Sequence, residues 1–194
     1  VSSNSTASNG FDCLANIYNQ AGYGDLLCSD NLFALFEATD VRKALYPTGM
    51  RGGTAAVFVN NKYPGTNGSE ISDTKVLRLS DVYLIAAEAS LPGDEAGALT
   101  YVNYITSRRG ATAIASSGAQ LFEDIITERR KELAFEGDRY NDLQRLKRDI
   151  TRSTNYPSAA RSIPYTNFRR LFPIPQAELD ANPNIRGQQN PGWF

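Results

Sequence analysis

The hydrophobic positions along the chain predict helices in its middle part. Apolar residues recur at the i, i+3, i+4, i+7 spacing of one helix face in two consecutive segments, at Leu79, Val82, Tyr83 and Ala86 and then at Ala98, Tyr101, Val102 and Ile105. The Leu-Pro-Gly sequence at 91–93 ends the first helix, Asp94 caps the second, and Gly110 ends it. Two antiparallel helices joined by a short turn form a hairpin of tetratricopeptide-like dimensions.

A second pair of helices is predicted at 119–136 and 138–150, separated by Gly137. Outside these helices the pattern is less regular. We expect a helix at 31–45, a short strand at 55–59 within a small hairpin, and a short helix near 175–180. The predicted fold class is mainly α, with tetratricopeptide-like helical hairpins, long irregular loops and little strand.

The chain has 194 residues, which is long enough to bury a core, and we interpret it as one structural domain with three segments. Residues 1–74 form a loop-rich segment with candidate ligand-binding loops. Residues 75–150 form the helical-repeat hairpins, and residues 151–194 form a Pro-rich extended segment that packs on the helices. Residues 1–6 lack the basic and apolar stretches of a secretion signal.

Charged residues fall on a helix face that should be apolar. Counted at 100° per residue from Phe122, the apolar stripe consists of Phe122, Ile125, Ile126 and Leu133. Arg129, Glu132 and Glu136 lie on the same side of the helix. A charge there must be paired, because a buried charge that loses its partner costs about 3 to 5 kcal/mol. We therefore expect Arg129 to be buried and bound to Glu132 or Glu136. The predicted structural ion-pair network comprises Glu128, Arg129, Glu132, Glu136 and Arg139.

The composition excludes several classes of function. The chain contains no histidine, which excludes Ser-His-Asp and Cys-His catalysis and His-containing zinc sites. A formal net charge of -1 without a basic stripe argues against a nucleic-acid partner, and no apolar run approaches the length of a membrane span. The three glutamates of the network could suggest glycoside hydrolysis, but the interleaved arginines neutralise them. We predict that the chain is not an enzyme and holds neither a cofactor nor a metal.

Six sequence blocks follow one another in a recognisable order. They are Asp40-x-Arg42, Lys62-Tyr63, Arg78-x-x-Asp81, the segment 101–105, the charged segment 128–139 and the proline-containing end 172–192. This order resembles the SusD/RagB family of outer-membrane nutrient-binding lipoproteins, from about residue 30 to the last residue. Proteins of that family are much longer, so the resemblance is to their C-terminal portion only. Asp40 and Arg42 are expected to form a structural ion pair.

The resemblance implies a non-catalytic protein that binds oligosaccharide or polysaccharide at the surface of the outer membrane. Such a protein delivers its ligand to a SusC-like TonB-dependent transporter, and it is held at the membrane by a lipid anchor that is absent from this chain. Two alternatives keep the fold: peptide capture of the RagB type, and a helical-repeat scaffold for a protein partner. A carboxylate-based glycosidase is a more distant alternative.

One loop carries the side chains expected for sugar recognition. A tyrosine ring packs on the apolar face of a pyranose, while carboxamides exchange hydrogen bonds with its hydroxyls. Proteins of the resembled family carry glycan contacts on loops before the Asp-x-Arg block, and a plain polar loop is the equal alternative. The candidate ligand-binding residues are Asn16, Tyr18, Asn19, Gln20 and Tyr23.

The two cysteines, Cys13 and Cys28, lie in the loop-rich segment. In an exported protein they are candidates for a disulfide, which would stabilise a loop of this size by about 3 kcal/mol. Two free thiols are the alternative, because sequence does not fix the geometry that a disulfide needs.

Overall fold

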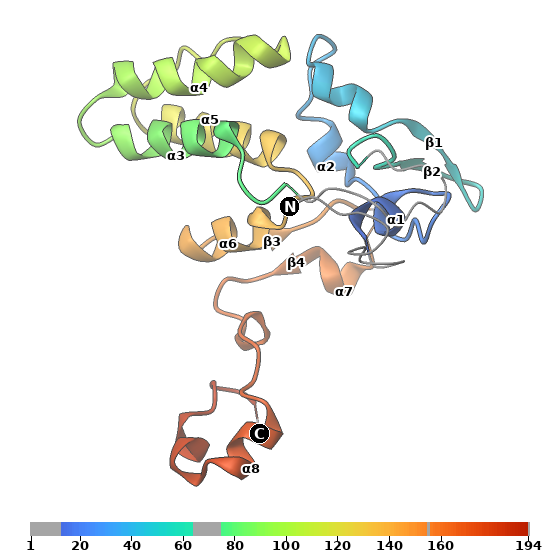
Figure 1. Ribbon diagram of the computed structural model, residues 1–194, viewed down its shortest axis with the longest axis vertical. Coiled ribbons are helices and arrows are strands. Elements are labelled where there is room, and N and C mark those ends of the chain that lie inside the picture. Colours follow the sequence, from blue (N-terminus) through green and yellow to red (C-terminus); the bar gives the residue numbers. More distant parts are fainter. Residues whose placement is uncertain (1–12, 64–74, 155, 194) are drawn as a thin grey trace, which may run out of the picture. The chain divides into compact units, whose positions relative to one another are not determined.

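The computed structural model describes residues 13–63, 75–154 and 156–193 (Figure 1). The chain divides into two compact units, Val1–Arg139 and Tyr140–Phe194. Residues 1–12 and 64–74 of the loop-rich segment lie outside the described residues. The expectation that residues 1–6 are not a secretion signal falls on this part of the chain. The segment boundaries at 74 and 150 and the single structural domain stay predictions.

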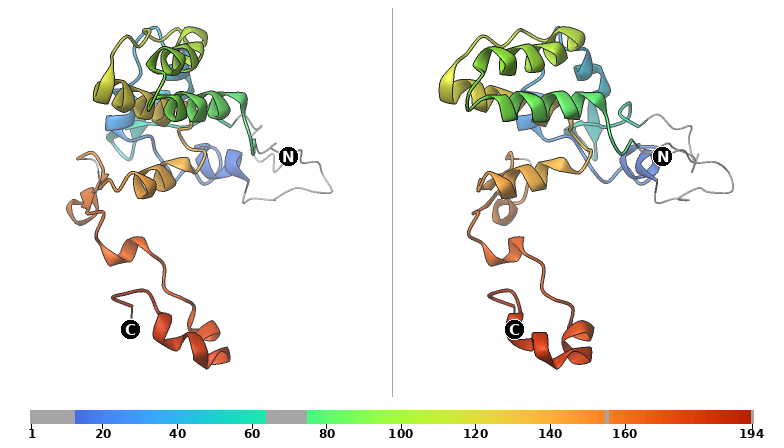
Figure 2. Two further views of the ribbon diagram at one scale, coloured as in Figure 1. Left: turned by 90° about the vertical axis from the view of Figure 1, so that its left-hand side faces the viewer. Right: turned by 60° about the vertical axis from the view of Figure 1, so that its left-hand side comes forward.

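Three long helices belong to the first unit: α3 (Leu79–Ser90), α4 (Glu95–Arg109) and α5 (Gly118–Glu132). They lie side by side, as Figures 1 and 2 show from three directions. Between α3 and α4 the carboxylate of Asp94 accepts a hydrogen bond from the Gly97 amide at 2.8 Å and caps α4. Gly110 ends α4 in the left-handed conformation, with φ of 64°. The predicted hairpin at 79–110 is therefore confirmed, and so is the mainly α fold.

The three helices share one apolar core. Seven buried residues form it: Leu84, Ala87, Ala98, Val102, Ile105, Leu121 and Ile125. Each fully buried Leu or Ile side chain stabilises the fold by about 1.5 to 3 kcal/mol relative to an exposed one. The loop between α4 and α5 is tied to α4 by the carboxamide of Asn103, which donates to and accepts from the main chain of Ile114, both at 2.8 Å. No helix in the described part of the chain is long and apolar enough to cross a membrane.

The earlier part of the first unit consists of short elements: α1 (Leu14–Tyr18), α2 (Asp30–Phe33), the 3-10 helix η2 (Val41–Leu45), β1 (Thr48–Arg51) and β2 (Thr54–Val57). The single helix predicted at 31–45 is wrong. The chain leaves α2 after Phe33, and Asp40 starts a new turn by accepting the Arg42 amide at 3.0 Å. The predicted hairpin is present, with β1 and β2 antiparallel and Gly52 and Gly53 at positive φ in the turn.

The predicted disulfide between Cys13 and Cys28 is wrong, because neither cysteine forms a disulfide and both are buried. Cys28 packs in a core cluster with Leu32 and Phe36 and pairs with Val57 in an isolated β-bridge. Cys13 packs in a different cluster with Ala15 and Tyr63. Each thiol therefore serves as a small apolar side chain in its own cluster.

We expect iodoacetamide to label both thiols in unfolded protein that has never been reduced. In the folded protein labelling should be slow, because both thiols are buried and burial raises the pKa of Cys28 to about 12, which depletes the reactive thiolate. Mass spectrometry of samples unfolded with and without a reductant gives the comparison. A sample that gains two labels only after reduction would show that a disulfide exists.

The second unit begins within α6 (Asp138–Arg145). Its other elements are β3 (Ile150–Thr151), α7 (Ser158–Arg161), β4 (Ser162–Ile163), the 3-10 helices η3 (Phe168–Arg170) and η4 (Pro183–Gln188), and α8 (Gln176–Ala181). The helix predicted near 175–180 is confirmed as α8. Buried Arg170 organises this unit: its guanidinium lies beside the rings of Tyr140 and Tyr165 and donates to the Arg148 carbonyl at 2.7 Å.

Candidate functional site

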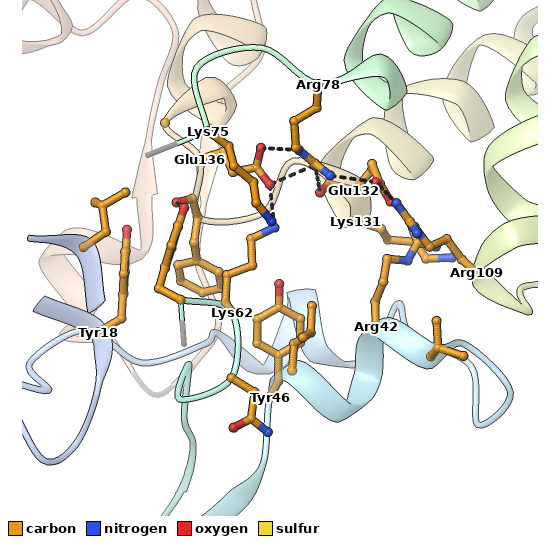
Figure 3. Close-up of a pocket in the computed structure, with 17 residues that line it drawn as sticks. Tyr18, Arg42, Tyr46, Lys62, Lys75, Arg78, Arg109, Lys131, Glu132 and Glu136 are labelled. Atoms are coloured by element: carbon orange, nitrogen blue, oxygen red, sulfur yellow. Dashed lines mark hydrogen bonds and ion pairs between the residues drawn. The ribbon is translucent and has the colours of Figure 1, made fainter. Parts of the chain in front are cut away.

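Glu132, the last residue of α5, is the centre of a buried ion-pair network (Figure 3). Its carboxylate accepts hydrogen bonds from Arg42 Nη1 at 2.9 Å, from Arg78 Nη1 at 3.1 Å and from Arg109 Nη2 at 2.6 Å. Burial alone would raise the pKa of Glu132, but the Arg109 hydrogen bond and the nearby guanidinium charges lower it to about 2. Glu132 is therefore an anion at any physiological pH.

The positions of these arginines follow from the local structure. Arg78 stands just before α3, and Arg109 is the last residue of α4. Gly110 follows Arg109, and a Cβ at that glycine would lie 2.7 Å from the Thr39 carbonyl oxygen. Glycine thus lets the end of α4 approach the turn that carries Arg42, so that both arginines reach one carboxylate.

Glu136 is a second carboxylate of the network. It binds Lys62 Nζ at 2.5 Å and Arg78 Nη2 at 2.8 Å. Burial lowers the pKa of Lys62, and the Glu136 hydrogen bond partly offsets this shift. The helix predicted at 119–136 ends instead at Glu132, and Phe135 has a φ of 64°. Such a conformation is unusual for a bulky residue, and it gives Glu136 a direction that a continued helix would not.

A third group of charges lies next to Glu132. Asp40 binds Arg42 Nη2 at 2.7 Å and Lys131 Nζ at 3.1 Å, and Glu128 binds the same two cations at 2.7 and 3.1 Å. The expected Asp40–Arg42 pair is thus present. Burial would raise the pKa of Asp40, but the hydrogen bonds from Arg42 outweigh this effect and the pKa is lowered.

Arg129 is buried, as expected, but its predicted partners are wrong. It binds Asp81, in the first turn of α3, at 2.5 Å, and lies 3.7 Å from Asp138. Glu132 and Glu136 bind other cations, so Arg129 joins α5 to α3. Arg139 is half-buried, and its place in the network stays a prediction.

Next to the network lies a cavity of about 560 Å³. One part of its wall is aromatic. The ring of Tyr18 stacks on that of Tyr63 at 5.4 Å between centroids, and Phe135 meets Tyr18 edge-on at the same distance. The other part is charged, and Figure 3 shows Lys62, Arg78 and Arg109 among the side chains there. A ring-shaped ligand with several hydroxyl groups could pack on the aromatic part and receive hydrogen bonds from the charged part.

Of the five predicted ligand-binding residues, Tyr18 lines this cavity. The side-chain amides of Asn19 and Gln20 form hydrogen bonds within the loop. Asn19 Oδ1 accepts the Ala21 amide at 3.0 Å, and Gln20 Nε2 donates to the Gly24 carbonyl at 2.9 Å. Asn16 is buried, and its carbonyl accepts the Tyr23 amide at 2.9 Å. Tyr23 is exposed.

Sequence reasoning did not single out the cavity. Lys62 and Arg78 belong to two of the motif blocks, and the sequence could have indicated them as partners of the glutamates in the charged segment 128–139. Those glutamates need cations, and these two blocks supply them. Lys75 and Arg109 carry no such signal. Five of the six cationic side chains of the lining are ion-paired, and the sixth is Lys75, which is exposed.

The SusD family profile matches residues 29–193. The chain belongs to the SusD family. The matched range contains every motif block described above, and four of these blocks supply Arg42, Lys62, Arg78 and Glu132 to the cavity. Tyr18 lies before the matched range.

Individual relatives agree with this assignment. The SusD-like protein P2 of Formosa agariphila is 34% identical over 143 residues, which are 66% of this chain and 28% of that protein. A SusD superfamily protein from Bacteroides vulgatus superposes on the whole chain with a TM-score of 0.88 at 26% identity, and the match covers 45% of its length. A second protein from Bacteroides vulgatus, provisionally named a sugar-binding protein, superposes on the whole chain with a TM-score of 0.82 at 30% identity, again over 45% of its length. The chain thus spans less than half the length of these relatives.

Proposed function

We propose that this chain is part of a protein that binds glycans at the cell surface, and that the cavity beside Tyr18 takes part in binding. The observation that supports this most directly is the wall of the cavity, where stacked tyrosine rings face a group of hydrogen-bond donors in a SusD family chain. Aromatic faces and fixed donors are the two components that sugar recognition needs.

The state of the carboxylates supports binding without hydrolysis. A glycosidase of the usual kind needs one carboxylic acid whose pKa is raised so that it can protonate the leaving group. Glu132 instead has a pKa of about 2, and Glu136 is paired with Lys62 and Arg78. Neither glutamate of the cavity wall suits the role of a general acid.

The family supports the wider setting of this proposal. A lipid-anchored protein on the outer membrane would pass its ligand to a SusC-like TonB-dependent transporter. Peptide capture remains the nearest alternative, because the same cavity donors would also bind a peptide. A scaffold role is favoured by one observation: Leu79, Val82 and Ile85 of α3 are large apolar side chains that are exposed to solvent.

We expect replacement of Tyr18 by Ala to weaken oligosaccharide binding by about 1 to 3 kcal/mol, as truncation of an aromatic contact does at other interfaces. Calorimetry with oligosaccharides on this chain and on Tyr18→Ala and Tyr23→Ala measures the effect. Tyr18 also packs on Tyr63 and Phe135, so the melting temperature of each variant must be recorded beside its affinity.

Three outcomes of that experiment differ in meaning. A loss confined to Tyr18→Ala supports the cavity, and a loss in both variants supports the whole loop 16–23 as the binding surface. Equal binding by the parent chain and both folded variants would place the ligand elsewhere. Recovery of the oligosaccharide intact after long incubation tests the absence of hydrolysis.

A further inference from the structure

The lining of the cavity carries more positive than negative charge. Two carboxylates, Glu132 and Glu136, face six cationic side chains: Arg42, Lys62, Lys75, Arg78, Arg109 and Lys131. Asp40 and Glu128 are outside the lining but pair with two of these cations. Six cations against four carboxylates leave two positive charges without a matching anion in this group.

Lys75 is the cation that is best placed to meet a ligand. It is exposed, and no residue in the described ranges forms an ion pair or hydrogen bond with its ammonium group. Arg78, in contrast, directs its guanidinium to Glu132 and Glu136 and also donates to the Glu132 carbonyl at 2.9 Å. Arg109 lies between these cases, because Glu132 binds its Nε and Nη2 while about a third of its side chain is exposed.

The charge of a ligand decides whether this surplus helps or hinders binding. A neutral sugar in the cavity would replace the water around Lys75 and Arg109 with hydroxyl acceptors, and these uncharged groups compensate the lost solvation of two cations only in part. A negatively charged group would compensate it more fully through a charge-assisted hydrogen bond, which is roughly twice as strong as a neutral one. The cavity, at about 560 Å³, lies within the range of small-molecule sites, so a sugar ring and its substituent can enter together.

We propose that the cavity selects acidic sugars, and that Lys75 binds their negatively charged substituent while the ring packs beside Tyr18. This inference rests on the proposed function. A uronic acid carboxylate and a sulfate ester share the required chemistry, since each places a delocalised anion on the rim of a pyranose. Lys75 sets the preference, and the paired arginines keep the wall rigid around it.

The test uses three oligosaccharides of equal length on this chain: neutral oligoglucose, oligogalacturonate and sulfated oligoglucose. We expect at least one acidic ligand to bind about tenfold more tightly than the neutral one in dilute buffer, which is the size of a hydrogen bond to a charged group. Replacement of Lys75 by Gln should remove most of this preference without changing the melting temperature. Lys147→Gln is the matched control, because Lys147 is also exposed, carries the same charge and does not line the cavity.

Salt provides a second readout. The preference of the parent chain should shrink between about 0.02 M and about 0.5 M salt, because screening acts on exposed charges. The stronger acidic ligand then tells carboxylate from sulfate. Equal or tighter binding of the neutral oligosaccharide, or an unchanged preference in Lys75→Gln, would overturn this inference and leave glycan binding intact. Failure of all three ligands to bind would count against glycan binding itself.

Discussion

Replacement of Glu132 by Gln is expected to lower the free energy of unfolding by about 3 to 5 kcal/mol. The carboxylate is almost completely buried and compensates guanidinium groups from three separate segments, at Arg42, Arg78 and Arg109. Glutamine has nearly the same shape but no charge, so three buried or half-buried cations would lose their common anion. Urea unfolding followed by circular dichroism gives the measurement.

Glu123→Gln is the matched control for this prediction. It makes the same chemical change on the same helix at an exposed position, so its effect should stay within about 0.5 kcal/mol. A Glu132→Gln variant that is as stable as Glu123→Gln would show that the network adds nothing to the fold. Buried ion pairs can be replaced by apolar residues at little cost, but removal of one partner alone leaves uncompensated charge.

The same group predicts how stability depends on pH. The ordinary pKa of a glutamate is 4.5, and in the folded chain Glu132 has a pKa of about 2. As the pH falls, the unfolded chain takes up a proton on this carboxylate before the folded chain does. The stabilisation is therefore complete above pH 4.5 and is lost as the pH falls towards 2. The loss amounts to about 3 kcal/mol from this one carboxylate. Glu132→Gln lacks the group, and its stability should therefore fall less steeply over this interval.

The helical part of the fold could be predicted because it depends on local signals. The apolar spacing in α3 and α4, the cap at Asp94 and the stop at Gly110 act within a few residues, and the structure follows them. The segment 31–45 differs because its apolar spacing suits a helix, yet the side chain of Asp40 binds the main chain of Arg42 and starts a separate turn. Local competition for backbone hydrogen bonds of this kind is not visible in periodicity.

The candidate site could be predicted only in part, for a related reason. Helix periodicity tells which charges face inward, but it does not tell which charges from other segments face them. Glu132 meets Arg42, which is 90 positions away in the sequence, and a pattern within α5 contains no trace of that partner. The end of α5 was also misplaced, because the left-handed conformation of Phe135 has no glycine signal at that position. The aromatic ring of Tyr18 makes it a candidate ligand-binding residue from the sequence alone. Lys75 becomes a candidate only because it lines the cavity.

Replacement of Arg129 by Ala is expected to destabilise the chain by about 2 to 4 kcal/mol, with a clear drop in melting temperature. Arg129 is buried, and its bond to Asp81 joins α5 to the first turn of α3, so its loss leaves a partly buried carboxylate without its cation. Arg108→Ala on α4 is the control. Its guanidinium lies over the Tyr104 ring at the surface, and its removal should cost about 1 kcal/mol or less.

A double-mutant cycle separates the bond from the rest of the side chain. If the Arg129–Asp81 pair carries the effect, the combined loss in Arg129→Ala with Asp81→Ala should be smaller than the sum of the single losses by about 1 to 3 kcal/mol. Asp138 lies 3.7 Å from Arg129, and Asp138→Ala in place of Asp81→Ala should show much weaker coupling because that contact is longer and more exposed. Additive losses with Asp81 would mean that this ion pair does not carry the effect and that Arg129 stabilises α5 through its other contacts. An unchanged melting temperature in Arg129→Ala would refute the prediction that buried Arg129 stabilises the fold.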